Sequence, residues 1–512
     1  MIPRLILLLT LMALMATHAC GGYRDLMKEF DDYRPPSYVK AREKAAPEHE
    51  PPPADVEFDS EKKRIMEAAK KWKRSLTAGG DERSSFGQPA RLLKMLQPAS
   101  TDAHVAEAAL ARRFSLETLE TLAFVRNPGV KAAEARLRAA IETFSQVLNL
   151  DEILRRYTAF TEGLMTGVGP IKGKDPVKTK FPFPGVLALK GEIVGQEVAA
   201  AREDLERARR EAVTGAGKTY WNLLFVQKAE TITEETLDLL KYLEEVAGSL
   251  YEAGRTSFQD VIKVRIEREI LEEELITLRE KGRNIESKIR EILNLSPSIK
   301  IGSPEGREPV RKIPTLDSLY PLALERRQEL RRIRAMVGKT ERMIEMAETM
   351  ILPPYTLNLS LYEDEAVTQV GSVAIQEDFP ISTKASTGAG LPKMPWYGTN
   401  DAYLRQTRQR LQALREDLKK AEAETLTLVR NAWFELDRAK REESLYKDSI
   451  IKLSRSVLDV SSRGYESGNV SFADVISSYT IWLKTNLAAE EKRSDLGIGW
   501  AVLEGAVGKS LR

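Results

Sequence analysis

Carboxylates, which can do acid, base or metal chemistry, are abundant in the body of this 512-residue chain. The three histidines are His18, His49 and His104, and the single cysteine is Cys20, so all four precede residue 105. Their positions exclude Ser-His-Asp and Cys-His catalysis and the common zinc ligands from the rest of the chain. No GxxxxGK[ST] phosphate-binding loop occurs. Carboxylates at helical spacing opposite Lys and Arg are typical of a solvated helix face, so we expect no enzyme activity, no cofactor and no metal.

A twelve-residue stretch occurs twice, and it organises the chain. We call Tyr251–Ile262 the first turn and Tyr465–Ile476, which starts 214 residues later, the second turn; eight of the twelve positions are identical. Each copy has a glycine, which can end a helix in the left-handed conformation, and three residues later a serine, which can cap the next helix. These residues are Gly254 with Ser257 and Gly468 with Ser471. The pattern predicts that each stretch is the turn of a helical hairpin.

The repeat predicts a duplicated body, with units at 105–295 and 314–508 and a linker at 296–313. Long helices are expected over 192–250 and 401–462. Apolar residues recur there and in the returning helices at spacings of three and four, which is the pattern of a coiled coil. They are Leu271, Leu275, Leu278, Ile285, Ile289 and Ile292 in one frame, and Val429, Ala432, Leu436, Ala439, Tyr446, Ile450, Leu453 and Val457 in the other, with Glu443 skipped. A narrow apolar seam beside broad charged faces indicates self-association.

Each unit also contains a break with strand character. In the second unit, apolar and polar residues alternate over 355–362 and again over 367–381, which predicts two strands. The corresponding segment of the first unit, 150–191, is less regular. Only 183–189 has strand character there, and 150–164 fits a helix as well as a strand. We expect two strands per unit.

The N-terminus has the features of a secretory signal over residues 1–20, with Arg4 followed by an apolar run from Leu5 to Met15. Cys20 stands where a lipoprotein signal is cleaved and its cysteine lipidated; cleavage after Ala19 without lipidation is the alternative. Residues 21–104 form a proline-rich, charged tail or strap with one predicted helix at 61–76. The formal net charge of +2 gives no indication of nucleic-acid binding. Beyond the signal, no apolar run approaches the roughly 20 residues of a membrane-spanning helix.

The signal, the duplicated unit with its strand break, and the turns that read Tyr-x-x-Gly-x-x-Ser-x-x-Asp-Val resemble the TolC-type outer-membrane efflux protein family over about 105–508. The resemblance implies a mainly α fold with a small β part. In it, long hairpins from a homotrimer form a coiled-coil tunnel, and four strands per protomer join a 12-stranded barrel in the outer membrane. It also implies passive export, together with a periplasmic adaptor and an inner-membrane pump, in efflux or type I secretion.

Position by position, the resemblance implies roles for residues of the two turns. Gly254 and Gly468 would lie at the periplasmic tips where the adaptor docks. Asp474 would contribute to an acidic ring at the pore entrance, and Tyr465 and Asp260 would form a latch between hairpins. Two departures from the family pattern occur: Ser477 stands where a second acidic ring is usual, and Val470 where a basic latch partner is usual.

A function of a different class also fits these features. A coiled-coil structural protein, tethered by lipid at Cys20 and lying in the periplasm without crossing the membrane, would show the same heptads and the same signal. The irregular first strand segment favours this alternative. The strands distinguish the two functions, because only a channel subunit needs 355–362 and 367–381 to face lipid.

Overall fold

The computed structural model describes residues 54–77, 84–148, 186–254, 256–351, 366–370, 373–380, 396–467 and 469–511. The chain divides into two units, 1–57 and 58–512, and nearly all described residues belong to the second. Several predicted features lie outside the described residues. They are the signal with Cys20, the strand segment of the first repeat up to residue 185, the strand at 355–362, and Gly468.

The described part of the first repeat from Leu116 onward has two short and two long helices. The short ones are α6 (Leu116–Arg126) and α7 (Pro128–Leu148), and the long ones are α9 (Val186–Glu252) and α10 (Phe258–Leu293). Asn127 separates the short helices because its side-chain Oδ1 accepts the amides of Gly129 and Val130, and Pro128 suits a first helical position. With 67 residues, α9 is about 100 Å long.

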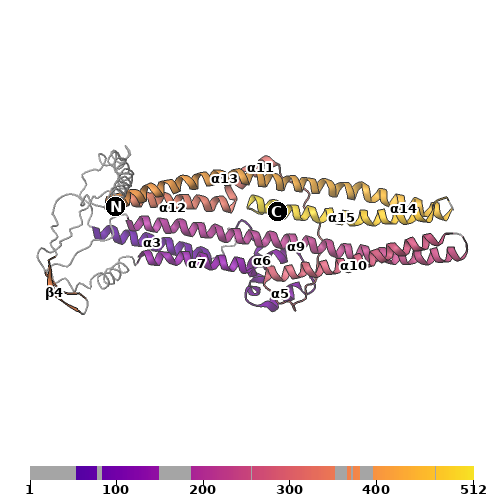
Figure 1. Ribbon diagram of the computed structural model, residues 1–512, viewed down its shortest axis with the longest axis horizontal. Helices are drawn as coiled ribbons and strands as arrows, with labels where there is room; N and C mark the ends of the chain where they lie inside the picture. The colour runs from indigo at the N-terminus through magenta and orange to yellow at the C-terminus, as the bar shows by residue number, and fades with distance from the viewer. Residues whose placement is uncertain are drawn as a thin grey trace, which may run out of the picture. The chain divides into compact units, whose positions relative to one another are not determined.

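The second repeat follows the same order. Its short helices are α11 (Leu316–Arg326) and α12 (Gln328–Ile351). The long outgoing helix consists of α13 (Trp396–Leu445), the π-helical segment η3 (Tyr446–Ile450) and α14 (Ile451–Glu466), and α15 (Phe472–Val507) returns. The prediction of a mainly helical, duplicated chain is therefore confirmed. Figure 1 shows the hairpin of α9 and α10 beside that of α13, α14 and α15.

Two strands lie between α12 and α13. β3 (Ala366–Val370) and β4 (Val373–Pro380) are antiparallel, with Val367 opposite Phe379 and Val370 opposite Val373. The alternation over 367–381 predicts one strand, whereas the structure has two there. An alternating pattern does not distinguish these cases, because both arms of a hairpin have the same period of two. That these strands form part of a β-barrel stays a prediction.

The helices of the second unit pack in a fixed order. In the half that contains α7 and α12, the neighbours along the array are α7, α9, α12 and α13. In the half that contains the turns, α9 packs against α10, α14 packs against α15, and α9 also packs against α15. The largest apolar core joins α6, α7, the first half of α9 and the end of α10. The heptad residues Leu271, Leu275, Leu278 and Ile289 of α10 are buried, as predicted.

Residues before the repeat also fold onto this core. α3 (Ala54–Thr77) contains the predicted helix at 61–76, and its Ile65 is buried in the largest core. α4 (Ala90–Leu96), the 3-10 helix η2 (Gln97–Ser100) and α5 (Ala103–Leu110) follow. β1 (Arg113–Phe114) then pairs in parallel with β2 (Ser303–Pro304) of the linker. The sequence does not predict these short elements, because they are stabilised by contacts with the repeats.

In each repeat the end of the last long helix is bound to the break between the two short helices, and we call this contact the joint. The Arg126 side chain is buried, and it donates to the carbonyls of Leu293 (2.7 Å) and Asn294 (3.3 Å) at the end of α10. In the second repeat, Arg327 donates to the carbonyl of Ala506 (2.7 Å), and Gln328 donates to that of Gly508 (2.7 Å). The last carbonyls of a helix lack partners within the helix, so both side chains satisfy groups that would otherwise be buried and unbonded.

Both helices end in the left-handed conformation at this joint. Asn294 has φ 50° and Gly508 has φ 83°. A Cβ at residue 508 would lie 2.7 Å from the Cα of Arg327, so glycine is required there by the close approach as well as by the positive φ. The long hairpins therefore return to the break between the short helices of their own repeat.

The π-helical segment changes which residues of the second hairpin are buried. The heptad predicts Leu453 and Val457 on the seam, but this prediction is wrong: Leu453 is 62% exposed and Ser454 is 5% exposed. Buried Leu436 precedes η3 and buried Ser454 follows it. A π-helical turn holds one more residue than an α-helical turn, so η3 shifts the seam by one position.

Replacing Arg126 with alanine should lower the free energy of unfolding by about 3 kcal/mol, because three buried carbonyls, including that of Ala99, lose a charged donor. Thermal unfolding followed by circular dichroism measures the change. Arg138→Ala, which removes an exposed pair with Glu134, should cost less than about 0.5 kcal/mol. Equal losses in both variants would contradict the role of Arg126.

Deleting Asp448 should leave the melting temperature unchanged or raise it, because the π-helical segment can become α-helical while Ser454 stays on the seam. The matched control deletes Lys241 from α9, which is α-helical throughout. That deletion should displace buried Leu243 and Ala247 and cost about 3 kcal/mol or more. If both deletions lower the melting temperature equally, η3 does not accommodate an extra residue.

Candidate functional site

Both repeated stretches are turns between helices, as the sequence predicts. In the first turn, Gly254 has φ 68° and its amide donates to the carbonyl of Tyr251 at 2.9 Å. Ser257 then caps α10, since its hydroxyl accepts the amide of Asp260 at 3.3 Å. In the second turn, Ser471 accepts the amide of Asp474 in the same way at 3.2 Å. The serine at each helix start follows from its preference for N-cap positions.

The carboxylate of Asp260 has several partners within its own turn. Ser257 and Thr256 donate their hydroxyls to its Oδ2 at 2.9 and 3.0 Å, and Lys263 lies 3.8 Å from its Oδ1. Partial burial raises the pKa of Asp260, but these hydroxyl donors, a backbone amide and the Lys263 charge outweigh it and hold the pKa below its usual value. The side chain is therefore charged at neutral pH and suited to accept a further donor.

Asp474 and Ser477 lie one helical turn apart at the start of α15, and both are exposed. The Ser471 hydroxyl donates to Asp474 Oδ2 at 2.7 Å. This contact leaves the carboxylate at the surface near the end of the hairpin. Val470 packs against Gly464 at the same end. The pore-entrance role of Asp474 stays a prediction, since one chain presents one such carboxylate.

A pair of aromatic rings crosses each turn, and the sequence reasoning did not single these pairs out. Tyr251 lies 5.3 Å from Phe258 in the first turn, and Tyr465 lies 5.2 Å from Phe472 in the second, between ring centroids. Their identical spacing in both copies was the available signal. The latch predicted between Tyr465 and Asp260 stays a prediction: the structure places them on different turns, with Tyr465 against Phe472.

The two turns differ in burial although their sequences match. Phe472 is 3% exposed because the second turn packs into an apolar core with Leu243 and Ala247 of α9. Phe258, its equivalent in the first turn, is 56% exposed. The second turn is thus covered by the first hairpin, while the same face of the first turn has solvent beside it in the single chain.

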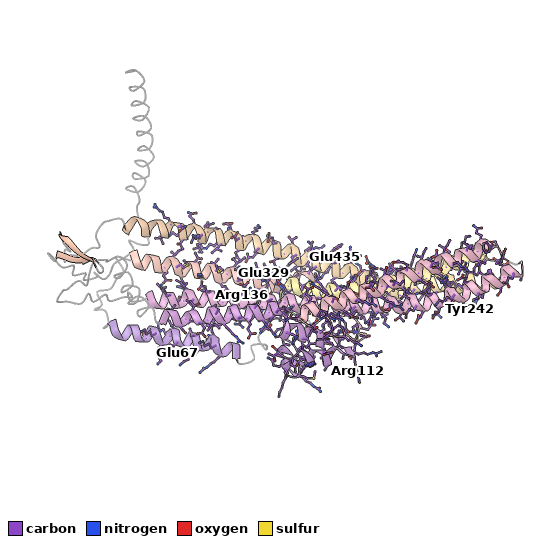
Figure 2. All side chains as sticks on the ribbon, turned by 60° about the horizontal axis from the view of Figure 1, so that its bottom comes forward. Glu67, Arg112, Arg136, Tyr242, Glu329 and Glu435 are labelled. Atoms are coloured by element: carbon purple, nitrogen blue, oxygen red, sulfur yellow. The ribbon has the colours of Figure 1, made fainter. Side chains whose placement is uncertain are left out.

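Partly buried ion pairs join α9 to α12. In each pair the α9 side chain is buried and its α12 partner is half-buried. Arg210 binds Glu329 through two nitrogens, at 2.8 and 2.5 Å, and these contacts, with Arg327 nearby, outweigh burial and lower the pKa of Glu329 to about 2. Glu203 pairs with Arg331 at 2.8 Å, yet burial raises the pKa of Glu203 to about 7. These pairs fix the register of the two helices, and Figure 2 places Glu329 among the helices of the array.

No group of three or more His, Cys, Asp or Glu side chains in the described ranges is close enough together to hold a metal ion. None of the described helices is long and apolar enough to cross a membrane.

One comparison with known protein families gives a match in the second repeat. Residues 319–509, which reach from α11 to the end of α15, match the family described as outer membrane efflux protein. The matched segment is 191 of the 512 residues. The resemblance expected from the two turns is thereby confirmed. No curated protein matches the chain in sequence.

Solved structures share the fold of this chain. The outer-membrane channel OprN has a TM-score of 0.57 and 17% identity, over 77% of this chain and 90% of that chain. The outer membrane protein VceC of Vibrio cholerae has a TM-score of 0.55 and 13% identity, over 78% and 97% of the two chains. For the open state of the MtrE outer membrane channel of Neisseria gonorrhoeae the values are 0.54 and 15%, over 78% and 89%. At these identities the likeness is one of fold.

Asp260→Asn should lower the free energy of unfolding by about 1 kcal/mol at pH 7, because a first-turn carboxylate stabilises the helix start. Since the folded pKa is depressed, this stability is present above the unfolded pKa and is lost as pH falls through the folded pKa. The difference in melting temperature from the unsubstituted protein should therefore disappear in strong acid. Asp417→Asn, exposed in the middle of α13, serves as the control and should change little at either pH.

Proposed function

We propose that the chain is one subunit of a homotrimeric exit duct in the outer membrane, through which an inner-membrane pump and a periplasmic adaptor export their substrate. The match of residues 319–509 to the outer membrane efflux protein family supports this function, as does a fold shared with proteins described as outer-membrane channels. The duct is passive, and in the described part of the chain the helical hairpins form its periplasmic wall.

The observation that carries the proposal is the set of large apolar side chains that the single chain leaves exposed. On α10 they are Phe258, Ile266, Ile270 and Ile276, and on α14 they are Leu453, Val457 and Val460. Aligned apolar side chains in water indicate a contact surface. Leu453 and Val460 are seven residues apart, so they lie on one face of α14.

The contact between hairpins within the chain supports a way in which these faces are covered. α9 and α10 of the first hairpin pack against α15 of the second, through the core that contains Phe472 and Ile476. Because the hairpins are repeats, the α14 face of one copy can receive α10 of the next copy in an equivalent way. Such a head-to-tail contact closes into a ring when the rotation allows it.

The strands support the membrane-spanning part of the proposal. β3 and β4 pair with each other, and their outer edges need further strands if they are to lie in lipid. With two strands from each repeat, three copies contribute twelve strands to a closed barrel. The pair from the first repeat and the lipid at Cys20 belong to the proposal too, and both lie outside the described residues.

At the opposite end, the turns form the proposed entrance. Three copies of Asp474 make an acidic ring that favours cations, with Ser477 in place of a second ring. Tyr465 and Asp260 hold neighbouring hairpins together, and Val470 makes this latch weaker than one with a basic partner. The adaptor docks at the tips around Gly254 and Gly468. The alternative, a lipid-tethered periplasmic structural protein, needs no entrance.

Reconstitution of the full chain into planar bilayers tests the duct and its entrance together. The trimer should conduct, and Asp474→Asn should raise the single-channel conductance or reduce the preference for cations, because the acidic ring is lost. Asp417→Asn, the same change on α13, should leave the current as it is.

Two outcomes would contradict different parts of the proposal. A monomer without conductance would contradict the duct and favour the tethered structural protein. A conducting trimer whose current does not respond to Asp474→Asn would remove the acidic ring and leave the duct intact.

A further inference from the structure

Helix α3 has an unusual charge distribution for this protein. Residues 62–74 contain seven basic residues and one acidic residue, Glu67, although the whole chain has a net charge of only +2. A stretch of α13, residues 410–424, shows the contrast: it has four basic and four acidic residues. The imbalance of α3 is therefore local.

The apolar side of α3 is already occupied. Ile65 is buried against Gly191 of α9, and Trp72 lies beneath the guanidinium of Arg202, 5.9 Å from the ring centroid. Lys73 pairs with Glu142 of α7 at 2.7 Å. Contacts at Gly191 and then at Arg202 show that α3 runs alongside α9 in the same direction.

The opposite side carries exposed cations. Lys63, Arg64, Lys70 and Lys71 are exposed, and their spacing of seven puts them on one side of the helix. We call these four residues the basic face of α3. Figure 2 shows Glu67, which lies among them in sequence, on α3 at the margin of the helix array. Four like charges with one acid between them repel one another, and a polyanion would relieve that repulsion.

We propose that the basic face of α3 binds an anionic, carboxylate-bearing polymer of the cell wall that lies beside the helical wall. The proposal rests on the proposed function, which puts α9, and therefore α3, roughly perpendicular to the outer membrane. It assigns to the N-terminal segment a contact with the wall in addition to its contact with α7 and α9.

Geometry favours a polymer over the lipid surface. The basic face reaches from residue 63 to residue 71, which is about 12 Å along the helix axis. Charges in solution are screened over about 8 Å at physiological ionic strength. A membrane surface perpendicular to α3 would therefore attract only the nearer pair of cations, whereas a chain lying alongside can reach all four.

Binding to purified peptidoglycan sacculi tests the proposal, with the full-chain protein held in nanodiscs of zwitterionic lipid. The protein should sediment with the sacculi at low salt and be released as salt rises. The quadruple variant Lys63→Gln, Arg64→Gln, Lys70→Gln, Lys71→Gln should bind about tenfold more weakly. The matched control makes the same change in charge on α13, at the exposed residues Arg410, Arg415, Lys419 and Lys420, and should bind as the unsubstituted protein does.

Circular dichroism and single-channel conductance of the quadruple variant should be unchanged. If the unsubstituted protein does not conduct, the proposed duct is contradicted. If the unsubstituted protein conducts but does not bind sacculi, only the proposal for the basic face is contradicted. Sacculus binding that does not respond to the four substitutions would overturn the proposal. A second outcome would also overturn it: the protein binds vesicles of phosphatidylethanolamine and phosphatidylglycerol but not sacculi, and the four substitutions abolish the vesicle binding. The partner would then be lipid.

Discussion

The carbonyl groups at the end of a long helix need partners, and this chain supplies them twice with an arginine at the break between two short helices. Arg126 closes α10 and Arg327 closes α15, with Asn294 and Gly508 turning the backbone out of each helix. Each hairpin is therefore anchored at the base of its own repeat. The position of both turns, and with it the geometry of the candidate entrance, depends on this anchor, because α9 and α13 are far too long to be fixed by the turns themselves.

From this base the hairpins lie side by side. The apolar faces of the two turns are equivalent, but the chain covers only that of the second turn. The second turn is buried by α9, while Phe258 of the first turn and the exposed apolar residues of α14 have no cover from the same chain. The extra residue in η3 contributes to this arrangement, because it turns Leu453 outward and brings Ser454 onto the seam. The duplication thus produces a chain whose uncovered faces match a contact that it already makes internally, and the proposed ring rests on this match.

Charge is distributed in three ways along the same array. Between α9 and α12, Arg210 and Glu329 pair directly and resist separation, since the buried charge of Arg210 would lose its carboxylate partner. On α13 the two signs alternate and are solvated. On α3 one sign prevails, on the side that faces away from the core. A single amphipathic helix can therefore dock through Ile65 and Trp72 and still present a cationic surface.

The sequence by itself determined the duplicated hairpins, both serine-capped turns and the buried seam of α10, because these depend on local preferences and on periods that neighbouring residues display. It also indicated a resemblance to the outer-membrane efflux proteins, through the residues of the turns. Only the tertiary structure decided that Arg126 and Arg327 cap distant helices, since 167 residues separate Arg126 from Leu293. It likewise decided that Leu453 faces solvent. The π-helical segment rotates the residues that follow it, but the apolar spacing in the sequence continues through it without a visible break. The burial of Glu203 and the difference between the two turns arise from packing between repeats, which no stretch of sequence records on its own.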